Sequence, residues 1–158
     1  MSRISRAAWR ATTHMIGGQV YDTLGGLPKD HDAAAQLDLI HRNKTAALIR
    51  AACTMGAICG RAHAAGYDAL AAYGEATGLM FQIVDDLLDV TQSAEHTGKA
   101  TGKDLPAGKL TYPGVHGTEA SRQAVERLRC EAHAALVPLG RAGSDLRELC
   151  DYMAVRTR

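Results

Sequence analysis

The segment FQIVDDLLDV, residues 81–90, places three carboxylates inside an otherwise apolar run. A helix advances about 100° per residue, so the three acids and a glutamine share one sector of it. These residues are Gln82, Asp85, Asp86 and Asp89. Carboxylates this close repel one another, and burial adds a desolvation cost to each charge. The cluster therefore needs cations, either Lys and Arg side chains from neighbouring segments or a divalent metal ion.

The composition of the chain favours a fold built only from helices. Its 158 residues are enough for a substantial core, and we expect a single domain over residues 1–158. Aromatic residues make up only 4% of the chain, whereas strands depend on aromatic and β-branched residues. The prediction is an all-α fold of five to six helices. Helical spacing and Gly or Pro breaks put them at residues 5–24, 33–41, 44–65, 67–90, 118–139 and 144–156.

Charge, hydropathy and cysteine usage exclude several classes of protein. Lys and Arg together number 18 and Asp and Glu 17, so the net charge of +1 gives no reason to expect nucleic acid as a partner. No apolar run approaches the roughly 18 residues that a membrane span needs. The four cysteines have no C-x-x-C spacing, which indicates reduced, buried thiols in a cytoplasmic protein.

A polar, glycine-rich segment follows the acids. It holds Lys99, Lys103 and Lys109 in GKATGKDLPAGK, residues 98–109. Gly lets the backbone approach a ligand closely, and loops of this length in compact domains are usually functional or disordered. Ammonium groups beside metal-loaded carboxylates make sense if both share an anion such as a diphosphate. The lysines therefore favour Mg²⁺, which is usually held by one or two carboxylates together with substrate phosphates.

A third element supports an anion site. Asn43 fits the N-cap of a helix over residues 44–65, which would put Lys44 and Thr45 in its first turn. Free N–H groups and the positive end of the helix dipole favour phosphate at such a position. We therefore expect this lysine and threonine to share a diphosphate with the acids.

These pieces together form a recognisable pattern. The chain closely resembles the C-terminal half of the trans-isoprenyl diphosphate synthases, the family of farnesyl and geranylgeranyl diphosphate synthases. The matching motifs occur in the family's order and cover almost the whole chain. They are GGQVYD at 17–22, KT at 44–45, FQIVDDLLDV at 81–90, GKATGKDLPAGKLTYP at 98–113 and YMAVR at 152–156.

The resemblance implies a site and a reaction. It assigns the Mg²⁺ ligands to Asp85, Asp86 and Asp89, and the binding of an allylic diphosphate to six residues. Those six are Lys44, Thr45, Gln82, Lys99, Lys103 and Lys109, and the implied catalytic residues are Lys44, Gln82 and Asp85. The family ionises an allylic diphosphate, isopentenyl diphosphate attacks the carbocation, and a proton is then lost. Metals and fixed cations stabilise the departing diphosphate as its charge develops.

The resemblance also implies that this chain carries only part of the site. The family's first aspartate-rich motif and its isopentenyl diphosphate-binding residues belong to the N-terminal half, and the Asp-Asp pair here is Asp85–Asp86 alone. We therefore expect half of the isoprenoid-synthase helical bundle, associated with itself, with an N-terminal half or with a full-length synthase. Apolar surface left by the missing half would face that partner. The candidates are Ala7, Trp9, Met15, Ile49, Met55, Ile58, Met80 and Ile83.

Three interpretations remain open from the sequence. The first is a prenyltransferase component in isoprenoid biosynthesis, active once another chain supplies the first motif. The second is an inactive half-synthase that regulates a full-length partner, and the third is a fragment of a longer chain. A terpene cyclase would share the all-α fold and the metal–diphosphate chemistry, but the GGQ and KLTYP motifs argue against it. The retained acids and lysines favour the first interpretation.

Overall fold

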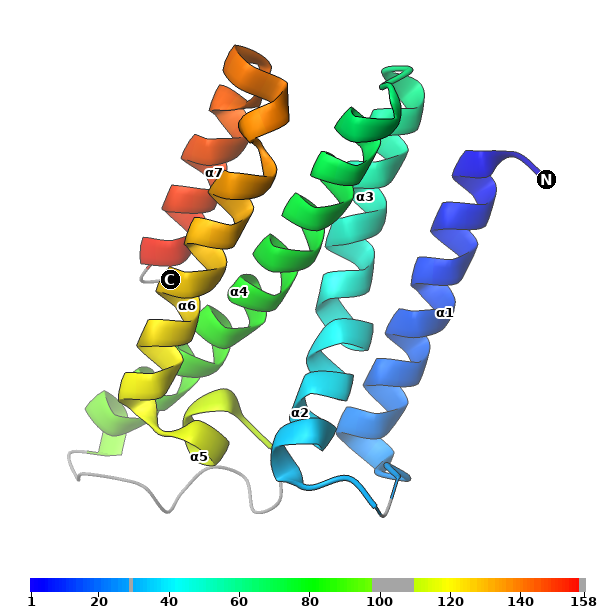
Figure 1. Cartoon of the computed structure of the whole chain (residues 1–158). Coiled ribbons are helices and arrows are strands. Elements are labelled where there is room, and N and C mark those ends of the chain that lie inside the picture. Colours follow the sequence, from blue (N-terminus) through cyan, green and yellow to red (C-terminus); the bar gives the residue numbers. More distant parts are fainter. Residues whose placement is uncertain (29, 98–109, 157–158) are drawn as a thin grey trace.

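The fold is a bundle of helices, which confirms the all-α prediction (Figure 1). The computed structural model describes residues 1–28, 30–97 and 110–156, and every regular element within them is helical. In chain order these elements are α1 (Arg3–Leu24), α2 (Ala33–His41), the π-helical segment η1 (Arg42–Ala46), α3 (Ala47–Cys59), α4 (Ala64–Thr97), α5 (Tyr112–His116), α6 (Thr118–Ala135), the 3-10 segment η2 (Val137–Gly143) and α7 (Ser144–Val155).

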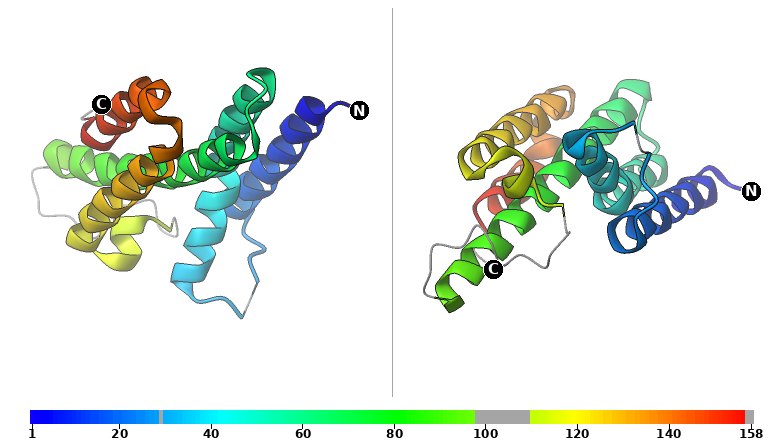
Figure 2. Two further views of the ribbon diagram at one scale, coloured as in Figure 1. Left: turned by 45° about the horizontal axis from the view of Figure 1, so that its top comes forward. Right: turned by 90° about the horizontal axis from the view of Figure 1, so that it is seen from below.

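The long helix α4 is the centre of the bundle. α3 and η1 pack along one side of it and α6 and α7 along the other, while α5 lies against α4, α6 and α2 (Figures 1 and 2). α1 is outermost and contacts α3, η1 and α2. Apolar residues at helical spacing explain this arrangement, because Tyr73, Met80 and Val84 of α4 share one core with Leu128 of α6 and Cys150 of α7.

Two glycines let η1 lie backbone to backbone with its neighbours. A Cβ added at Gly18 of α1 would overlap the backbone nitrogen of Lys44. A Cβ added at Gly78 of α4 would lie 2.6 Å from the Cα of Ala46. The π-helical turn is therefore held between α1 and α4 at distances that no other residue type would permit at these positions.

The helix start predicted at Lys44 is wrong. α2, η1 and α3 follow one another without a break, so Lys44 and Thr45 lie in the interior of a helical segment. The cap is at Asp32, whose side chain accepts a 2.8 Å hydrogen bond from the backbone N–H of Ala35. Asn43 donates its side-chain N–H to a carbonyl one turn back, at 2.8 Å, instead of capping. The free N–H groups of a helix start are thus not available to a phosphate here.

Other helix boundaries differ from the prediction for local reasons. α4 continues to Thr97, past the predicted end at residue 90. The short helix α5 was not predicted, because its Tyr-Pro start usually indicates extended chain. A continuous helix was expected over residues 118–139, but it ends at Ala135 and η2 follows. Pro138, at the start of η2, has no N–H to continue an α-helix, and Gly140, with a φ of 53°, is the non-helical residue within η2.

The predicted apolar surface is correct only in part. Trp9 is 68% exposed on α1, as expected. Met80 and Ile83 are buried, at 0% and 2% exposed, because they belong to the core that α4 forms with α6 and α7. The remaining five candidates are half-buried: Ala7, Met15, Ile49, Met55 and Ile58.

The expectations about thiols and membranes have different outcomes. All four cysteines are free, but only Cys150 is buried and Cys53 half-buried, whereas Cys59 and Cys130 are exposed. The prediction of buried thiols is therefore wrong for two of them. In the part of the chain that the structure describes, no helix combines the length and apolarity that a membrane crossing requires.

We expect Gly78→Ala to destabilise the protein, because its methyl group would meet the backbone of η1. Overpacking of this kind costs about 1–3 kcal/mol, and equilibrium unfolding in urea would measure the loss. Gly56→Ala in α3 is the matched control, since nothing lies within 4 Å of a Cβ added there. Alanine exceeds glycine in helix propensity by about 1 kcal/mol, so the control should gain stability. Equal gains in both variants would contradict the close approach of α4 and η1.

Candidate functional site

The three acids of α4 lie in different environments. Asp86 is buried, with 2% of its surface exposed, whereas the side chain of Asp85 is 48% exposed and Asp89 is also exposed. The helical spacing placed all three in one sector, but the neighbouring elements cover that sector unevenly. One carboxylate is closed to solvent and two are open to it.

Asp86 is the hub of a buried hydrogen-bond network. Its Oδ2 accepts a 2.8 Å hydrogen bond from the backbone N–H of Tyr112 and lies 3.3 Å from Nε2 of His41. Its Oδ1 accepts from Nε2 of Gln82 at 3.2 Å. Burial by itself raises the pKa of Asp86, but the contacts with His41, Tyr112 and Gln82 outweigh it and hold the pKa below its usual value. Both oxygens are used within the protein, so this carboxylate positions its neighbours.

The network extends from α4 into η1. The hydroxyl of Thr45 donates a 2.6 Å hydrogen bond to Oε1 of Gln82, whose amide nitrogen donates to Asp86. The next residue back, Lys44, pairs with Asp22 near the C-terminal end of α1, at 2.5 Å. The structure thus links Thr45 and Gln82 to Asp86, while Lys44, the neighbour of Thr45, contacts Asp22. The predicted role of these residues in binding a diphosphate stays a prediction.

Asp85 has a partner from the far end of the chain. Arg156, the residue after α7, donates a 2.8 Å hydrogen bond from its guanidinium to Oδ1 of Asp85. The same guanidinium lies over the ring of Phe81, 4.0 Å from the ring centre. α7 is therefore tied to the acid-bearing stretch of α4 by an ion pair and a cation–π contact.

The three predicted lysines Lys99, Lys103 and Lys109 lie outside the described residues, and their place in the site stays a prediction. The chain that follows them is described, and Tyr112 comes three residues after the last lysine. The backbone N–H of Tyr112 is bonded to Asp86. The return of the chain after the lysine-rich segment is therefore fixed beside the acids.

Asp85 and Asp89 have the chemistry that a magnesium site requires. They are one helical turn apart, Asp89 is exposed and Asp85 is half-exposed. Mg²⁺ commonly binds one or two carboxylates while waters and phosphates complete its octahedron. Within the described residues no group of three or more His, Cys, Asp or Glu side chains is arranged to hold a metal. The donors present thus fit an open site that a ligand completes, and they do not form a closed cage.

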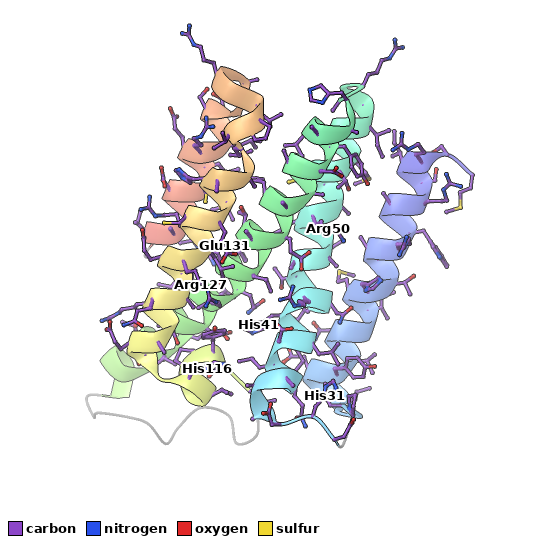
Figure 3. The ribbon with its side chains drawn as sticks, in the orientation of Figure 1. His31, His41, Arg50, His116, Arg127 and Glu131 are labelled. Carbon is purple, nitrogen blue, oxygen red and sulfur yellow. The ribbon has the colours of Figure 1, made fainter. Side chains whose placement is uncertain are left out.

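A cavity of about 620 Å³ lies between α2, α4, α5 and α6. His116, Arg127 and Glu131 lie around it, in the gap between α2 and α6 (Figure 3). Among the described residues, none of the predicted site residues lines this cavity. His41, which stacks on the ring of Tyr112 with centroids 6.2 Å apart, separates it from the acids. The space is therefore distinct from the predicted diphosphate site.

Four contact partners in this region were not predicted from the sequence. Asp22, Tyr112 and Arg156 lie inside the motifs GGQVYD, KLTYP and YMAVR, so membership in a motif was a usable signal for them. His41 belongs to none of these motifs. Its approach to Asp86, 45 positions along the chain, follows only from the packing of α2 on η1 and of η1 on α4.

Sequence comparison identifies relatives across most of the chain. A model of the polyprenyl synthetase family matches residues 2–135. Geranylgeranyl pyrophosphate synthase 10, mitochondrial, of Arabidopsis thaliana is 47% identical over 130 residues, which are 81% of this chain and 38% of that protein. Geranylfarnesyl diphosphate synthase, chloroplastic, of Leucosceptrum canum is 43% identical over 148 residues, 91% of this chain and 40% of that protein. The chain thus spans about two-fifths of the length of these curated relatives.

Solved structures have the same arrangement of helices. A decaprenyl diphosphate synthase from Rhodobacter capsulatus superposes with a TM-score of 0.80 at 29% identity, over 99% of this chain and 60% of that one. An FPP/GFPP synthase from Zymomonas mobilis gives a TM-score of 0.76 at 30% identity, over 95% of this chain and 49% of that one. On the family match, the sequence identities and the shared fold, the chain belongs to the polyprenyl synthetase family.

Proposed function

We propose that this chain is a prenyltransferase component in isoprenoid biosynthesis. It would bind Mg²⁺ and an allylic diphosphate for head-to-tail condensation with isopentenyl diphosphate. The observation that carries the proposal is the contact between η1 and the acid-bearing stretch of α4, where Thr45 bonds to Gln82 next to the open carboxylate of Asp85. The names of the relatives, which are geranylgeranyl and geranylfarnesyl synthases, agree with allylic diphosphates as substrates.

The three acids of α4 would have two different roles, metal binding and the positioning of neighbouring residues. Asp85 and Asp89 would offer oxygens to Mg²⁺, because both reach solvent. Bound Mg²⁺ supplies positive charge that stabilises the leaving diphosphate. Asp86, which the family resemblance counts among the metal ligands, would act mainly by holding Gln82 and the start of α5 in place.

The cationic and amide groups would bind and orient the diphosphate. Lys44 pairs with Asp22 in the described arrangement and is part-exposed, so its ammonium can transfer a hydrogen bond to an arriving phosphate. The amide of Gln82 is fixed at both ends, since its oxygen accepts from Thr45 and its nitrogen donates to Asp86. Its second N–H then has a defined direction. Further donors are proposed from the lysine-rich segment: Lys99, Lys103 and Lys109.

A partner chain is part of the proposal. The first aspartate-rich motif and the isopentenyl diphosphate site would come from an N-terminal half or a full-length synthase, bound as a hetero-oligomer. A homo-oligomer would repeat the Asp85–Asp86 pair of this chain, but it would not supply a separate first motif. The cytoplasmic location stays a prediction, and several relatives carry chloroplastic or mitochondrial in their names.

The chain should restore prenyl transfer to a full-length synthase whose own second aspartate motif has been disabled. We expect Mg²⁺-dependent formation of a longer prenyl diphosphate in the mixture, measured with radiolabelled isopentenyl diphosphate. Asp85→Asn in this chain should reduce that rate at least about 100-fold, as loss of a group that stabilises transition-state charge does. Asp68→Asn, an exposed acid on the same helix, is the matched control and should leave the rate unchanged.

Two other results would contradict this function. If the mixture forms a stable complex without product, the chain is a regulatory half-synthase. If Asp85→Asn and Asp68→Asn behave alike, the acids of α4 do not take part in the chemistry. Size-exclusion chromatography of the same mixtures separates a failure to associate from a failure to react.

Asp86→Asn should destabilise the fold much more than Asp85→Asn. Breaking a buried pair costs about 3–5 kcal/mol, whereas the pair of Asp85 with Arg156 is open to solvent on its carboxylate side, which screens it and lowers its contribution. The folded-state pKa of Asp86 is lowered, so its contribution is complete above the unfolded pKa, near 4, and is lost as pH falls through the folded value. Urea unfolding should therefore show the difference in stability between the unmodified chain and Asp86→Asn shrinking as the pH falls below about 4. A difference that stays constant from pH 7 to pH 3 would argue against a charged, hydrogen-bonded Asp86.

A further inference from the structure

We infer that Arg156 is an exchangeable counter-ion: it neutralises Asp85 when no metal is bound and transfers to the diphosphate when a divalent ion takes Asp85. The inference rests on the proposed function, since it assumes that Asp85 receives the metal. It assigns a ligand-binding role to the end of α7, which the sequence included only as part of a matching motif. Arg156 is thus proposed as a further diphosphate-binding residue of this site.

The arginine is held in place by more than its acid. Its guanidinium lies 4.0 Å from the centre of the Phe81 ring, well inside the range of a cation–π contact. One of its terminal nitrogens is 3.5 Å from the carbonyl oxygen of Phe81. The side chain of Arg156 is only 15% exposed, whereas that of Asp85 is 48% exposed. The cation is therefore the fixed member of the pair and the carboxylate is the member open to solvent.

The guanidinium also has donors to spare. It carries five N–H groups, and its described contacts with Asp85 and Phe81 involve a single terminal nitrogen. Its Nε is buried and has no hydrogen-bond partner among the described residues. A planar guanidinium matches phosphate oxygens well and often binds two of them at once. A diphosphate beside Asp85 would thus meet a cation that is already positioned.

Metal and arginine compete for the same carboxylate. A divalent ion on Asp85 places two positive charges close to Arg156, and like charges at such distances repel strongly where water is partly excluded. The ion pair must weaken, and the released guanidinium then needs another anion. Arg156 therefore opposes binding of the metal alone and favours binding of the metal together with diphosphate. These two effects have opposite signs.

The test uses the full chain and two separate titrations. Binding of Mn²⁺ alone would be followed by electron paramagnetic resonance, and binding of inorganic diphosphate in the presence of Mg²⁺ by calorimetry. For Arg156→Gln we expect Mn²⁺ to bind about 5-fold tighter, because a nearby positive charge is gone. We expect diphosphate to bind about 10-fold weaker, because a charge-assisted hydrogen bond is lost. Arg156→Lys should keep the Mn²⁺ affinity of the unmodified chain and lose part of the diphosphate affinity, since lysine keeps the charge without the planar fork.

The control is Arg141→Gln, which removes the same charge from an exposed position in η2. Arg141 precedes the N-terminal end of α7, whereas Arg156 follows its C-terminal end. Arg141→Gln should change neither affinity by more than about 2-fold, because exposed charges farther apart than a Debye length are screened. If Arg156→Gln lowers the affinity for both Mn²⁺ and diphosphate, or changes neither affinity, the counter-ion role is wrong. If the unmodified chain binds Mn²⁺ or diphosphate no better than Asp85→Asn does, the proposed function itself fails. The two failures are therefore distinguishable.

Discussion

The buried carboxylate of Asp86 is the constraint on which the geometry of this site depends. A carboxylate with 2% exposure needs hydrogen-bond donors to remain charged. Here they come from His41 at the end of α2, from the backbone of Tyr112 at the start of α5, and from Gln82 of α4 itself. Gln82 is thereby oriented to accept from Thr45 of η1. One buried charge fixes how four helical elements meet around the acids.

The glycines determine whether this network can form. A threonine side chain is short, so the hydroxyl of Thr45 reaches Gln82 only if η1 lies very close to α4. Gly78 lies one turn before Gln82 on the same face of α4, and it allows the backbones to touch there. On the opposite side of η1, Gly18 brings α1 close, so that Lys44 reaches an acid of α1. Two neighbouring residues of η1 therefore contact different helices, Thr45 bonding to α4 and Lys44 pairing with α1.

The composition and periodicity of the sequence predicted the fold class and which residues share a helix face. They did not predict how deeply each side chain is buried. Composition and helical spacing correctly predicted an all-α fold, and the spacing placed the three acids on one helix. It could not predict that Asp86 is buried while Asp85 is half-exposed, because that difference depends on α5 and on the path of α2. The N-cap signal at Asn43 was misleading, since a π-helical turn continues the hydrogen bonding that a cap would start. Met80 was expected at the surface because the missing half was assumed to cover it, yet it lies in the core formed with α6 and α7.

The ion pairs explain why this site would discriminate between ligands. In the described arrangement Lys44 is paired with Asp22, and Arg156 is paired with Asp85. Each of these charges is therefore already neutralised by another side chain before a ligand binds. A metal ion that binds alone would be attracted by the carboxylate of Asp85 but repelled by the displaced Arg156. A phosphate that binds alone would be repelled by the negative charge of the acids. On the proposed function, a diphosphate that arrives with its metal would satisfy both sides at once, because its oxygens would accept from the released cations while the metal would take the released carboxylate. The internal pairs would then make binding of the two components cooperative and would disfavour either component alone.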